Sequence, residues 1–191
     1  VPPRTVTPPP PESPEQRAAR EAFERQAAIE RNVASAVGAE RAGRIDQPPG
    51  DCAWFYYRAV LDLDAGNQDA MQGLERVQDD MIGRALEFAR EMDFESAERL
   101  REDALLVRED RAAVDAAYEQ VRGIRLEHAG ELEVAAVQAM DAGDFNAAER
   151  VLIELIALGD MDDTVNQLRR RLEEARIYGG FKPGQTVRDH F

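Results

Sequence analysis

The sequence predicts an all-α protein in which antiparallel helical hairpins stack as a short solenoid. No proline occurs between Gly50 and Lys182. Ala, Leu, Glu, Arg and Gln dominate this stretch, and these residues lose little conformational freedom in a helix. Apolar residues also recur there at three- and four-residue spacing, which is typical of helices with one buried face. The chain has 191 residues, 43% of them hydrophobic, and can therefore bury a core in one domain or two small ones.

The predicted helical domain lies between two segments of linker composition. The first 14 residues contain seven of the ten prolines, which is typical of an extended tether. Residues 179–191 return to Gly and Pro and show no helical period. We therefore expect a Pro-rich linker at 1–13, a helical-repeat domain at 14–178 and a C-terminal linker at 179–191. A frayed native C-terminus is the alternative for the last segment.

The first helix is expected from about Pro14 to Gly43. Ser13 is suited to be its N-cap, with Pro14 at the first helical position and Gln16 able to complete a capping box. Residues 47–50, with the sequence Gln-Pro-Pro-Gly, then require a loop. The apolar positions expected on one stripe of this helix are Ala22, Ile29, Val33, Ala36 and Val37.

Two more helices are expected before residue 93. The second begins near Asp51 and ends before Ala65, where Gly66 and Asn67 follow. The third begins near Gln68 and stops at the turn that follows. Its expected apolar positions are Met71, Leu74, Met81, Ala85, Phe88 and Met92.

A short repeat marks two turns between helices. Residues 93–100 (DFESAERL) align with residues 144–151 (DFNAAERV), 51 residues later. In each copy we expect a long helix to end, Asp and Phe to form a tight turn, and a shorter helix to return with small Ala residues at the contact. Each copy therefore predicts one helical hairpin.

The second long helix is expected at about 110–141, its partner at 146–158, and a last helix at about 161–178. Gly159 is expected to end the shorter helix. The total is roughly seven helices. The expected inward-facing residues of the second long helix are Val114, Ala117, Val121, Ile124, His128, Leu132, Ala135 and Ala139. Those of the last helix are Val165, Leu168 and Leu172.

Residues 53–67 (AWFYYRAVLDLDAGN) resemble the second half of a tetratricopeptide repeat. In that family a small residue is followed four residues later by an aromatic one, then by an apolar pair and a Leu-Asp-Pro-x-Asn turn. The residues in these places are Ala53, Tyr57, Val60, Leu61, Leu63 and Asn67, and Ala65 stands where proline is usual. The resemblance covers about residues 34–158, with a spacing longer than the usual period of about 34. It implies a curved helical surface that is presented to another protein.

Residues 181–189 (FKPGQTVRD) resemble the lead-in to formylglycine-generating-enzyme-like (sulfatase-modifying factor) domains of bacterial proteins. In some of these a Ser/Thr kinase, a membrane helix, a Pro-rich tether and a helical-repeat region precede that domain. The resemblance implies that the chain is part of a membrane-anchored signalling or secretion-associated protein, and that it lies in the periplasm. A cytoplasmic location is the alternative.

The sequence contains no candidate catalytic, cofactor-binding or metal site. Cys52 is the one cysteine, and we interpret it as a small core residue rather than a reactive thiol at a helix start. His128 is interpreted as a hydrogen-bonded core or interface residue, and His190 as solvated. The acidic groups at 102–103, 109–110 and 160–163 lack the spacing of a calcium loop. We therefore expect neither an enzyme nor a cofactor.

Charge and hydropathy narrow the possible partners. The net charge of −14 opposes binding to nucleic acid, and a mean hydropathy of −0.52 opposes membrane insertion of this segment. Four consecutive aromatic residues cannot all face inward on a helix. The resemblance to the tetratricopeptide repeat implies that Tyr57 is in the core, so at least one of Trp54, Phe55 and Tyr56 is expected at a surface. We predict a protein–protein interaction and spacer module, with Trp54, Phe55, Tyr56 and His128 as candidate partner-binding residues. Self-association, for example as a homodimer, is the alternative.

Overall fold

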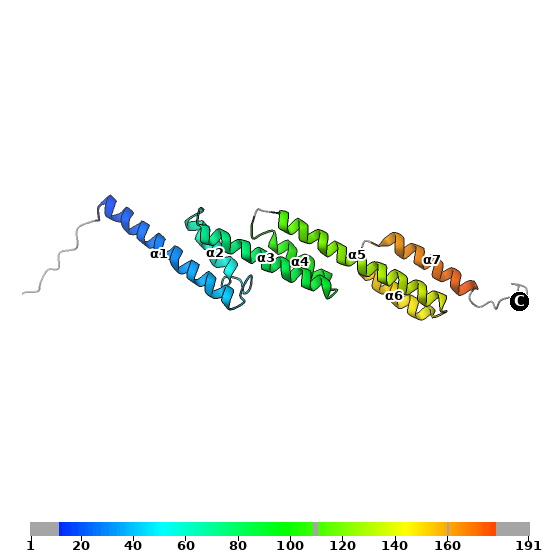
Figure 1. Ribbon diagram of the computed structural model, residues 1–191. Helices are drawn as coiled ribbons and strands as arrows, with labels where there is room; N and C mark the ends of the chain where they lie inside the picture. Colours follow the sequence, from blue (N-terminus) through cyan, green and yellow to red (C-terminus); the bar gives the residue numbers. More distant parts are fainter. Residues whose placement is uncertain (1–11, 109–110, 160, 179–191) are drawn as a thin grey trace, which may run out of the picture. The chain divides into compact units, whose positions relative to one another are not determined.

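The computed structural model describes residues 12–108, 111–159 and 161–178, and within these ranges it contains seven α-helices and no strand (Figure 1). Helix ends lie within about two residues of those predicted. Neighbouring helices pack together, as α1 does with α2, and α5 with α6 and α7. The predicted all-α fold class with sequential helix packing is confirmed. The helices are α1 (Pro14–Arg41), α2 (Ala53–Leu63), α3 (Gln68–Arg90), α4 (Phe94–Ala104), α5 (Ala112–Asp141), α6 (Phe145–Ala157) and α7 (Asp162–Tyr178).

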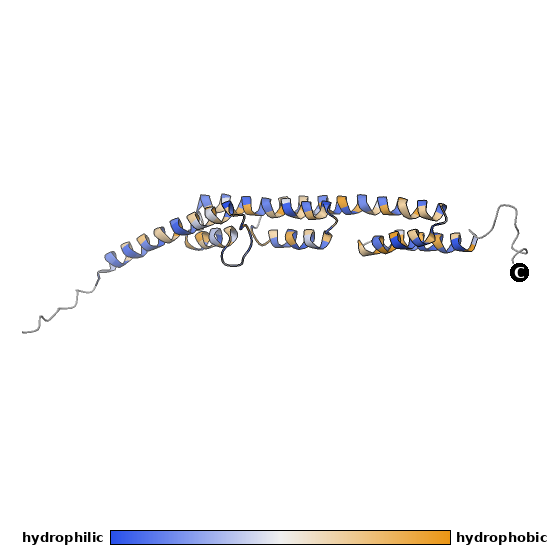
Figure 2. Cartoon of the chain, turned by 90° about the horizontal axis from the view of Figure 1, so that it is seen from below, coloured by the Kyte–Doolittle hydropathy of each residue, from blue (hydrophilic) through white to orange (hydrophobic). Residues whose placement is uncertain are grey.

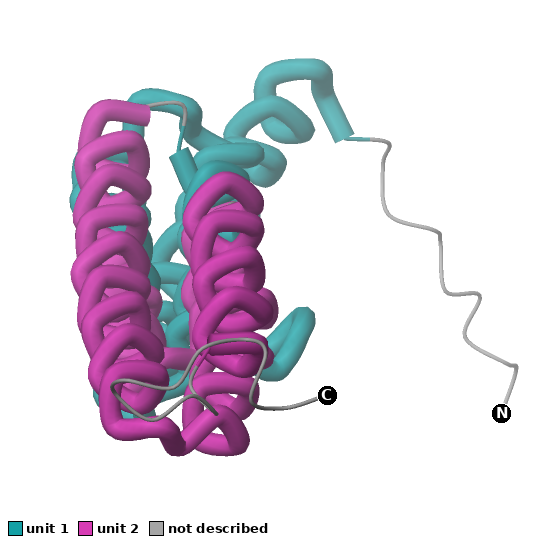
Figure 3. The backbone as a smooth tube through the Cα atoms, turned by 90° about the vertical axis from the view of Figure 1, so that its right-hand side faces the viewer, with its two compact units in different colours: residues 1–81, 103–110 teal, residues 82–102, 111–191 magenta. Residues whose placement is uncertain are grey.

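The chain divides into two compact units, which Figure 3 shows in teal and magenta. Unit 1 comprises residues 1–81 and 103–110, and unit 2 comprises residues 82–102 and 111–191. The boundary falls within α3 and within α4, so the predicted helical domain 14–178 contains parts of both units.

The N-terminal half of α1 contributes no buried residue to the described part of unit 1. Ser13 caps the helix as predicted: its hydroxyl accepts a hydrogen bond from the Gln16 amide at 3.2 Å, and the Gln16 side chain accepts one from the Ser13 amide at 3.0 Å. Residues 14–26 are all exposed, and α1 extends beyond α2 (Figure 1). Figure 2 shows this part of α1 as mainly hydrophilic with single hydrophobic residues. Ala22 is therefore not on a buried stripe, which begins only at Ile29.

Tyr57 of α2 packs in the core of unit 1 and contacts both α1 and α3. The Tyr57 side chain is only 1% exposed, and its ring lies directly over Gly73 of α3, where an added Cβ would come within 2.3 Å of ring atoms. Its hydroxyl donates to Glu40 Oε2 at 2.9 Å, and Arg76 bonds both that hydroxyl, at 3.0 Å, and the Glu40 carboxylate. The ring and this polar network join α1, α2 and α3. Tyr57 is a core residue, as predicted.

Unit 2 is held by small and aliphatic side chains. Two clusters of buried residues occur there. In the smaller one, Val121 of α5 packs with Ala89, Phe94 and Ala97. In the larger one, α7 packs on α5 and α6 through the three residues predicted to face inward. The buried members of the larger cluster are Ala129, Leu132, Ala136, Met140, Ala148, Leu152, Leu155, Val165, Leu168 and Leu172.

The two predicted turns have the same hydrogen bonds. The Asp93 amide bonds the Phe88 carbonyl at 2.9 Å, and the Asp144 amide bonds the Ala139 carbonyl at 2.9 Å. The residues just before them, Met92 and Gly143, have φ angles of +64° and +74°. These are Schellman motifs, in which a left-handed residue ends the long helix. Asp93 and Asp144 then cap α4 and α6 by accepting from the backbone amides three residues on, at 3.0 and 2.9 Å.

The repeat extends well beyond the eight residues recognised in the sequence. Buried positions recur at the same 51-residue spacing along α3, α4 and α5 on one side and α5, α6 and α7 on the other. Helix α7 therefore corresponds to the first half of α5. The buried pairs are Gln78 and Ala129, Met81 and Leu132, Ala85 and Ala136, Ala89 and Met140, Ala97 and Ala148, Ala104 and Leu155, Val114 and Val165, Ala117 and Leu168, and Val121 and Leu172.

The predicted inward faces of the long helices were partly wrong. In the second half of α5 the buried residues are Ala129, Leu132, Ala136 and Met140, so His128, Ala135 and Ala139 are only partly buried. A straight helix drifts by about 20° per heptad relative to a strict 3.5-residue repeat, and over 30 residues this displaces the buried face by nearly one residue.

On α3 the predicted stripe was also wrong at its two ends. Met71 is 46% exposed, and the neighbouring Ala70 is buried in its place. Met92 is 45% exposed because it lies beyond the end of the helix, in the turn.

Candidate interaction surface

The aromatic segment at the start of α2 places one ring in solvent. Phe55 is 48% exposed, whereas Trp54 and Tyr56 are half-buried. The Phe55 and Tyr56 rings meet edge to face, with 5.4 Å between their centroids. The expectation that at least one of the three lies at the surface is confirmed for Phe55. That they bind a partner stays a prediction.

The loop before α2 fixes the orientation of this segment. The Ala53 and Trp54 amides, which begin the helix, donate to the Arg44 and Ile45 carbonyls at 2.8 and 3.0 Å. Asp51 accepts a hydrogen bond from the Tyr56 hydroxyl at 2.8 Å and forms an ion pair with Arg44. The bond to Asp51 raises the pKa of Tyr56 above its usual value, with burial as a smaller cause. The backbone bonds to Arg44 and Ile45 and the contacts of Asp51 therefore hold the start of α2, and with it Phe55, in one orientation.

His128 belongs to the other unit. It lies on α5, where its side chain is 23% exposed and its Nδ1 lies 3.5 Å from Glu131 Oε2, one turn along the same helix. Of the four candidate partner-binding residues, Trp54, Phe55 and Tyr56 therefore lie together on α2 of unit 1. His128 lies on α5 of unit 2 and is half-buried.

Cys52 and the acidic groups are the other positions that the sequence offers for chemistry. Cys52 is 2% exposed and precedes α2, so its thiol is shielded as a core residue. Across residues 12–108, 111–159 and 161–178, no group of three or more Cys, His, Asp or Glu residues is arranged to hold a metal ion. In the same ranges, none of the helices combines the length and apolarity needed to cross a bilayer. Residues 109–110, 160 and His190 lie outside the described residues.

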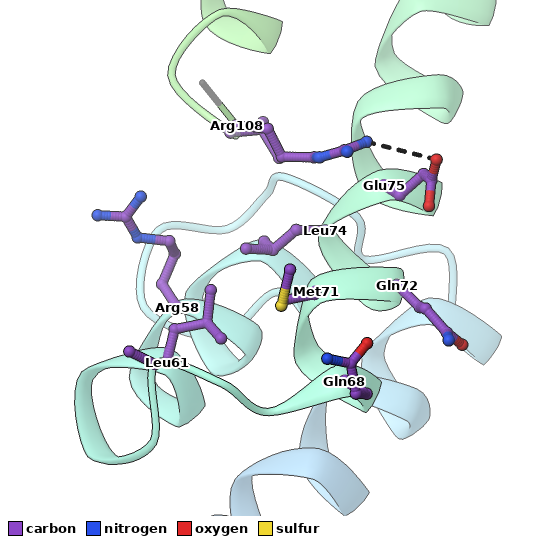
Figure 4. A pocket seen from close by; sticks show the side chains of 10 residues that line it. Arg58, Leu61, Gln68, Met71, Gln72, Leu74, Glu75 and Arg108 are labelled. Atoms are coloured by element: carbon purple, nitrogen blue, oxygen red, sulfur yellow. Dashed lines mark ion pairs between the residues drawn. The ribbon is translucent and has the colours of Figure 1, made fainter. Parts of the chain in front are cut away.

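Unit 1 has an open groove lined mainly by α2 and α3 (Figure 4), with a volume of about 600 Å³. The groove, called here the α2/α3 groove, has an apolar floor of Leu61, Leu74 and Val107. Met71 lies at its surface, and at one end Arg108 pairs with Glu75 at 3.6 Å. The other lining residues are Arg58, Ala65, Gln68 and Gln72.

Several surface features were missed by the sequence analysis. Phe23 of α1 is 75% exposed. The sequence pattern of α1 does not indicate that residues 14–26 are all exposed. Ile153 and Ile156 of α6 are 66% and 43% exposed. Their sequence is continuous with the buried Leu152 and Leu155, so only the positions of α5 and α7 distinguish the covered side of α6 from the open one.

The network around Tyr57 was also missed. Burial is the main cause that raises the pKa of Tyr57 to about 12, and the hydrogen bond to Glu40 adds to it. The same carboxylate raises the pKa of Arg76 above its usual value. The network therefore stabilises the neutral phenol of Tyr57 and the charged guanidinium of Arg76, which suits a structural contact.

Comparison with models of known protein families, with curated protein sequences and with solved structures found no match to this chain. The class that the described residues define is an all-helical domain of seven helices packed as sequential hairpins.

Proposed function

We propose that this chain is a non-catalytic protein–protein interaction and spacer module. The observation that carries the proposal is the uncovered N-terminal half of α1, where residues 14–26 are all exposed and Phe23 reaches 75%. A helical segment of this length is marginal in water without tertiary packing. Contact with another protein supplies that packing, and aromatic side chains are favoured anchors of such contacts.

The start of α2 supplies a second anchor in the same unit. Phe55 is 48% exposed on a helix start that is fixed by Asp51 and by the carbonyls of the preceding loop. A ring held in this way loses little conformational entropy when it is buried by a partner. Trp54 and Tyr56, half-buried beside it, contribute mainly by holding the segment in place.

The resemblance to tetratricopeptide repeats supports the same role. Residues 53–67 carry the family's pattern, and paired helices joined by short turns follow it. Proteins of that family present a helical surface to other proteins. The proposed partner is therefore a protein, and we propose no cofactor, metal or nucleic acid.

We further propose that the module belongs to a larger, membrane-anchored bacterial signalling or secretion-associated protein, in its periplasmic part. The support is the Pro-rich start and the resemblance of residues 181–189 to the lead-in of formylglycine-generating-enzyme-like domains, some of them associated with a Ser/Thr kinase. Residues 1–11 and 181–189 lie outside the described residues.

The test compares two variants with a matched control. Phe23→Asp and Phe55→Asp each place a charge at an exposed ring, and Leu106→Asp does so at a 62% exposed residue of the same unit. Affinity purification from the source cells, quantified against the unaltered chain, is expected to lose one and the same partner with both Phe variants and to keep it with the Leu106 variant. Circular dichroism checks that all three remain folded.

Two outcomes would contradict the proposal. Retention of every partner by both Phe variants would show that these rings bind nothing. If light scattering instead shows a concentration-dependent mass that both Phe variants abolish, the module is a self-association device, which is the alternative role.

A further inference from the structure

Leu106 is an exposed aliphatic residue beside the α2/α3 groove of unit 1. It is 62% exposed, although it lies between the half-buried Leu105 and the buried Val107. Val107 and Arg108, the next two residues, line the groove. Consecutive Cα atoms are about 3.8 Å apart, so the Cα of Leu106 lies within about 8 Å of that of Arg108. A protruding leucine and an apolar groove are therefore neighbours on one unit.

The α2/α3 groove offers the apolar surface that a leucine side chain needs. Leu61, Leu74 and Val107 form its floor, and Met71 is 46% exposed at its surface. Figure 4 shows Leu61, Met71 and Leu74 close together in the groove. A methionine side chain is flexible and adapts its shape to what it contacts. A leucine placed here removes apolar surface of both sides from water.

The exposed leucine and the apolar groove surface occur in the same repeat copy. At the 51-residue spacing, the place of Leu106 is taken by Ala157, which is also exposed. The place of Met71 is taken by Arg122. Unit 2 therefore has a methyl group and a guanidinium where unit 1 has a leucine and a thioether. This joint difference indicates that the two features of unit 1 act together.

A two-fold axis between two copies of the chain brings the two features into contact. Leu106 does not fill the groove of its own copy, because its side chain is largely in solvent. Since the leucine and the groove are adjacent, the same rotation that places Leu106 of one copy in the groove of the other also makes the reverse contact. Such a contact is isologous, so it is made twice and closes as a dimer.

Charge complementarity supports the same arrangement. The Leu106 amide donates to the Asp103 carbonyl at 3.0 Å, so both residues belong to one turn. Asp103 is exposed in that turn, and Arg58 is exposed where it lines the groove. Neither side chain forms a hydrogen bond or an ion pair with a residue that the structure describes. When Leu106 enters the groove of another copy, an acidic group therefore accompanies it towards an unpaired basic one.

We propose that two copies of this chain form a homodimer through unit 1, in which Leu106 of each copy inserts into the α2/α3 groove of the other. The inserted side chain contacts Met71 and the groove floor, and Asp103 pairs with Arg58 of the other copy. Because two short turns supply the contact, the interface is small, and the Kd is on the order of 10–100 µM. This inference goes beyond the proposed binding of a different protein and does not depend on it.

Sedimentation equilibrium of the full chain measures the dimer. We expect the mass to rise with concentration from 21.3 kDa towards twice that value. Leu106→Asp places a carboxylate in an apolar groove and should raise the Kd at least about tenfold. Val134→Asp is the matched control, because Val134 is 55% exposed on α5 of unit 2, and it should leave the Kd unchanged. A mass that stays at 21.3 kDa up to about 1 mM, or a Kd that Leu106→Asp does not change, would overturn the proposal.

Charge reversal tests the ion pair between the copies. Arg58→Glu brings two carboxylates together at each contact and Asp103→Arg brings two guanidinium groups together, so each variant alone should raise the Kd about fivefold or more. In an equimolar mixture of the two variants, the mixed dimer has opposite charges at both contacts. Its Kd should lie within about threefold of that of the unaltered chain. A mixture that dimerises no better than either variant alone would contradict the proposed pairing.

Photocrosslinking identifies the occupant of the groove. With a photoreactive amino acid in place of Leu106, we expect an adduct between two copies, linked through a peptide that contains residues 61–75. This adduct should form with the purified chain and in source cells. An adduct with a different protein alone would assign the groove to that protein and overturn the homodimer.

The two proposals fail separately. Phe23→Asp and Phe55→Asp should leave the Kd of the dimer unchanged, whereas Leu106→Asp should raise it without removing the partner protein. If both Phe variants abolish the dimer, the copies meet through these rings, and the proposed insertion of Leu106 is wrong. If the dimer persists but no partner protein is found, the homodimer stands and the proposed binding of a different protein is wrong.

Discussion

The turn between α3 and α4 and the turn between α5 and α6 make the same hydrogen bonds with different residues. The left-handed position is Met92 in the first turn and Gly143 in the second, with φ angles only 10° apart, at +64° and +74°. The residue three places after the capping Asp is Ser96 in the first and Ala147 in the second. The comparison teaches that the shared Asp cap and the closing Schellman bonds are sufficient to set this turn, and that the residues around them are free to vary.

The two copies differ more strongly in the long helices. At equivalent places stand Gly73 of α3, over which the Tyr57 ring lies, and Ile124 of α5, which is half-buried against an apolar cluster. One copy therefore uses a glycine to admit an aromatic ring, and the other fills the same place with an aliphatic side chain.

The largest loss of stability is expected from a substitution at Gly73, the position where the two copies differ most. Gly73→Ala places a methyl group 2.3 Å from Tyr57, whose ring is buried and cannot move aside easily. We expect the free energy of unfolding to fall by roughly 2 to 3 kcal/mol. Urea unfolding followed by circular dichroism measures it.

Gly83→Ala is the matched control for this substitution. Gly83 is on the same helix and has nothing within 4 Å of an added Cβ. Alanine should therefore stabilise the helix by about 0.5 to 1 kcal/mol. Equal effects of the two substitutions would show that the Tyr57 ring does not depend on the absence of a side chain at residue 73.

Exchanging the residues at the two positive-φ positions, Met92 and Gly143, should change the stability of the protein in opposite directions. A residue other than glycine in this conformation costs about 1 to 2 kcal/mol, part of which is offset by the lower entropy of its unfolded chain. Gly143→Met should therefore destabilise by about 1 kcal/mol, and Met92→Gly should stabilise by roughly 0.5 to 1 kcal/mol. Thermal unfolding of the two variants and of the double variant gives both values.

The double variant provides the control for the turn exchange. The two sites are far apart in sequence, and their effects should add to within about 0.5 kcal/mol. A loss of stability with Met92→Gly would show that the Met92 side chain, 45% exposed, makes a contact that outweighs the backbone strain.

The smallest effect concerns the capping carboxylates. Hydrogen bonds from Ser96, through its hydroxyl and its amide, hold the pKa of Asp93 below the usual value. Because folding favours the carboxylate, Asp93 stabilises the protein above the usual pKa of Asp, and this contribution is lost as the pH falls through its own lower pKa. Ser96→Ala leaves only the amide, as at Ala147 in the other turn, and should raise the pKa of Asp93. NMR titration of the Asp93 carboxyl group measures it.

Ser96→Thr is the conservative control, because it keeps the hydroxyl and should keep the low pKa of Asp93. If Ser96→Ala leaves the pKa unchanged, the amide alone accounts for the stabilisation of the carboxylate, and the two caps are equivalent despite their sequences.

Much of the fold was predictable because its signals are local. Ser13, Pro14 and Gln16 marked the start of α1, and the Asp-Phe pairs marked two turns, because capping depends on residues within one turn of a helix. The inward residues of α7 also followed from helical periodicity, and the core position of Tyr57 followed from the resemblance to the tetratricopeptide repeat pattern.

The remainder depends on contacts between distant residues. That Gly73 lies under Tyr57 follows only from the packing of α2 on α3, and a glycine within a helix gives no sign of the ring above it. The buried face of α5 shifted at Ala129 because a long helix drifts from a strict heptad. Of the candidate binding residues, only Phe55 proved well exposed, and the open face of α6 was not recognised, because Ile153 and Leu152 look alike in the sequence.

Helix α7 packs only on its predecessors α5 and α6 within the described part of unit 2. In a linear array of this kind, a helix whose described neighbours lie on one side only opens at a lower cost in free energy than a helix packed on two sides, such as α5. Its backbone amides should exchange with deuterium earlier than those of buried positions such as Ala136. Equal exchange rates along α7 and at Ala136 would show that unit 2 opens as one cooperative body.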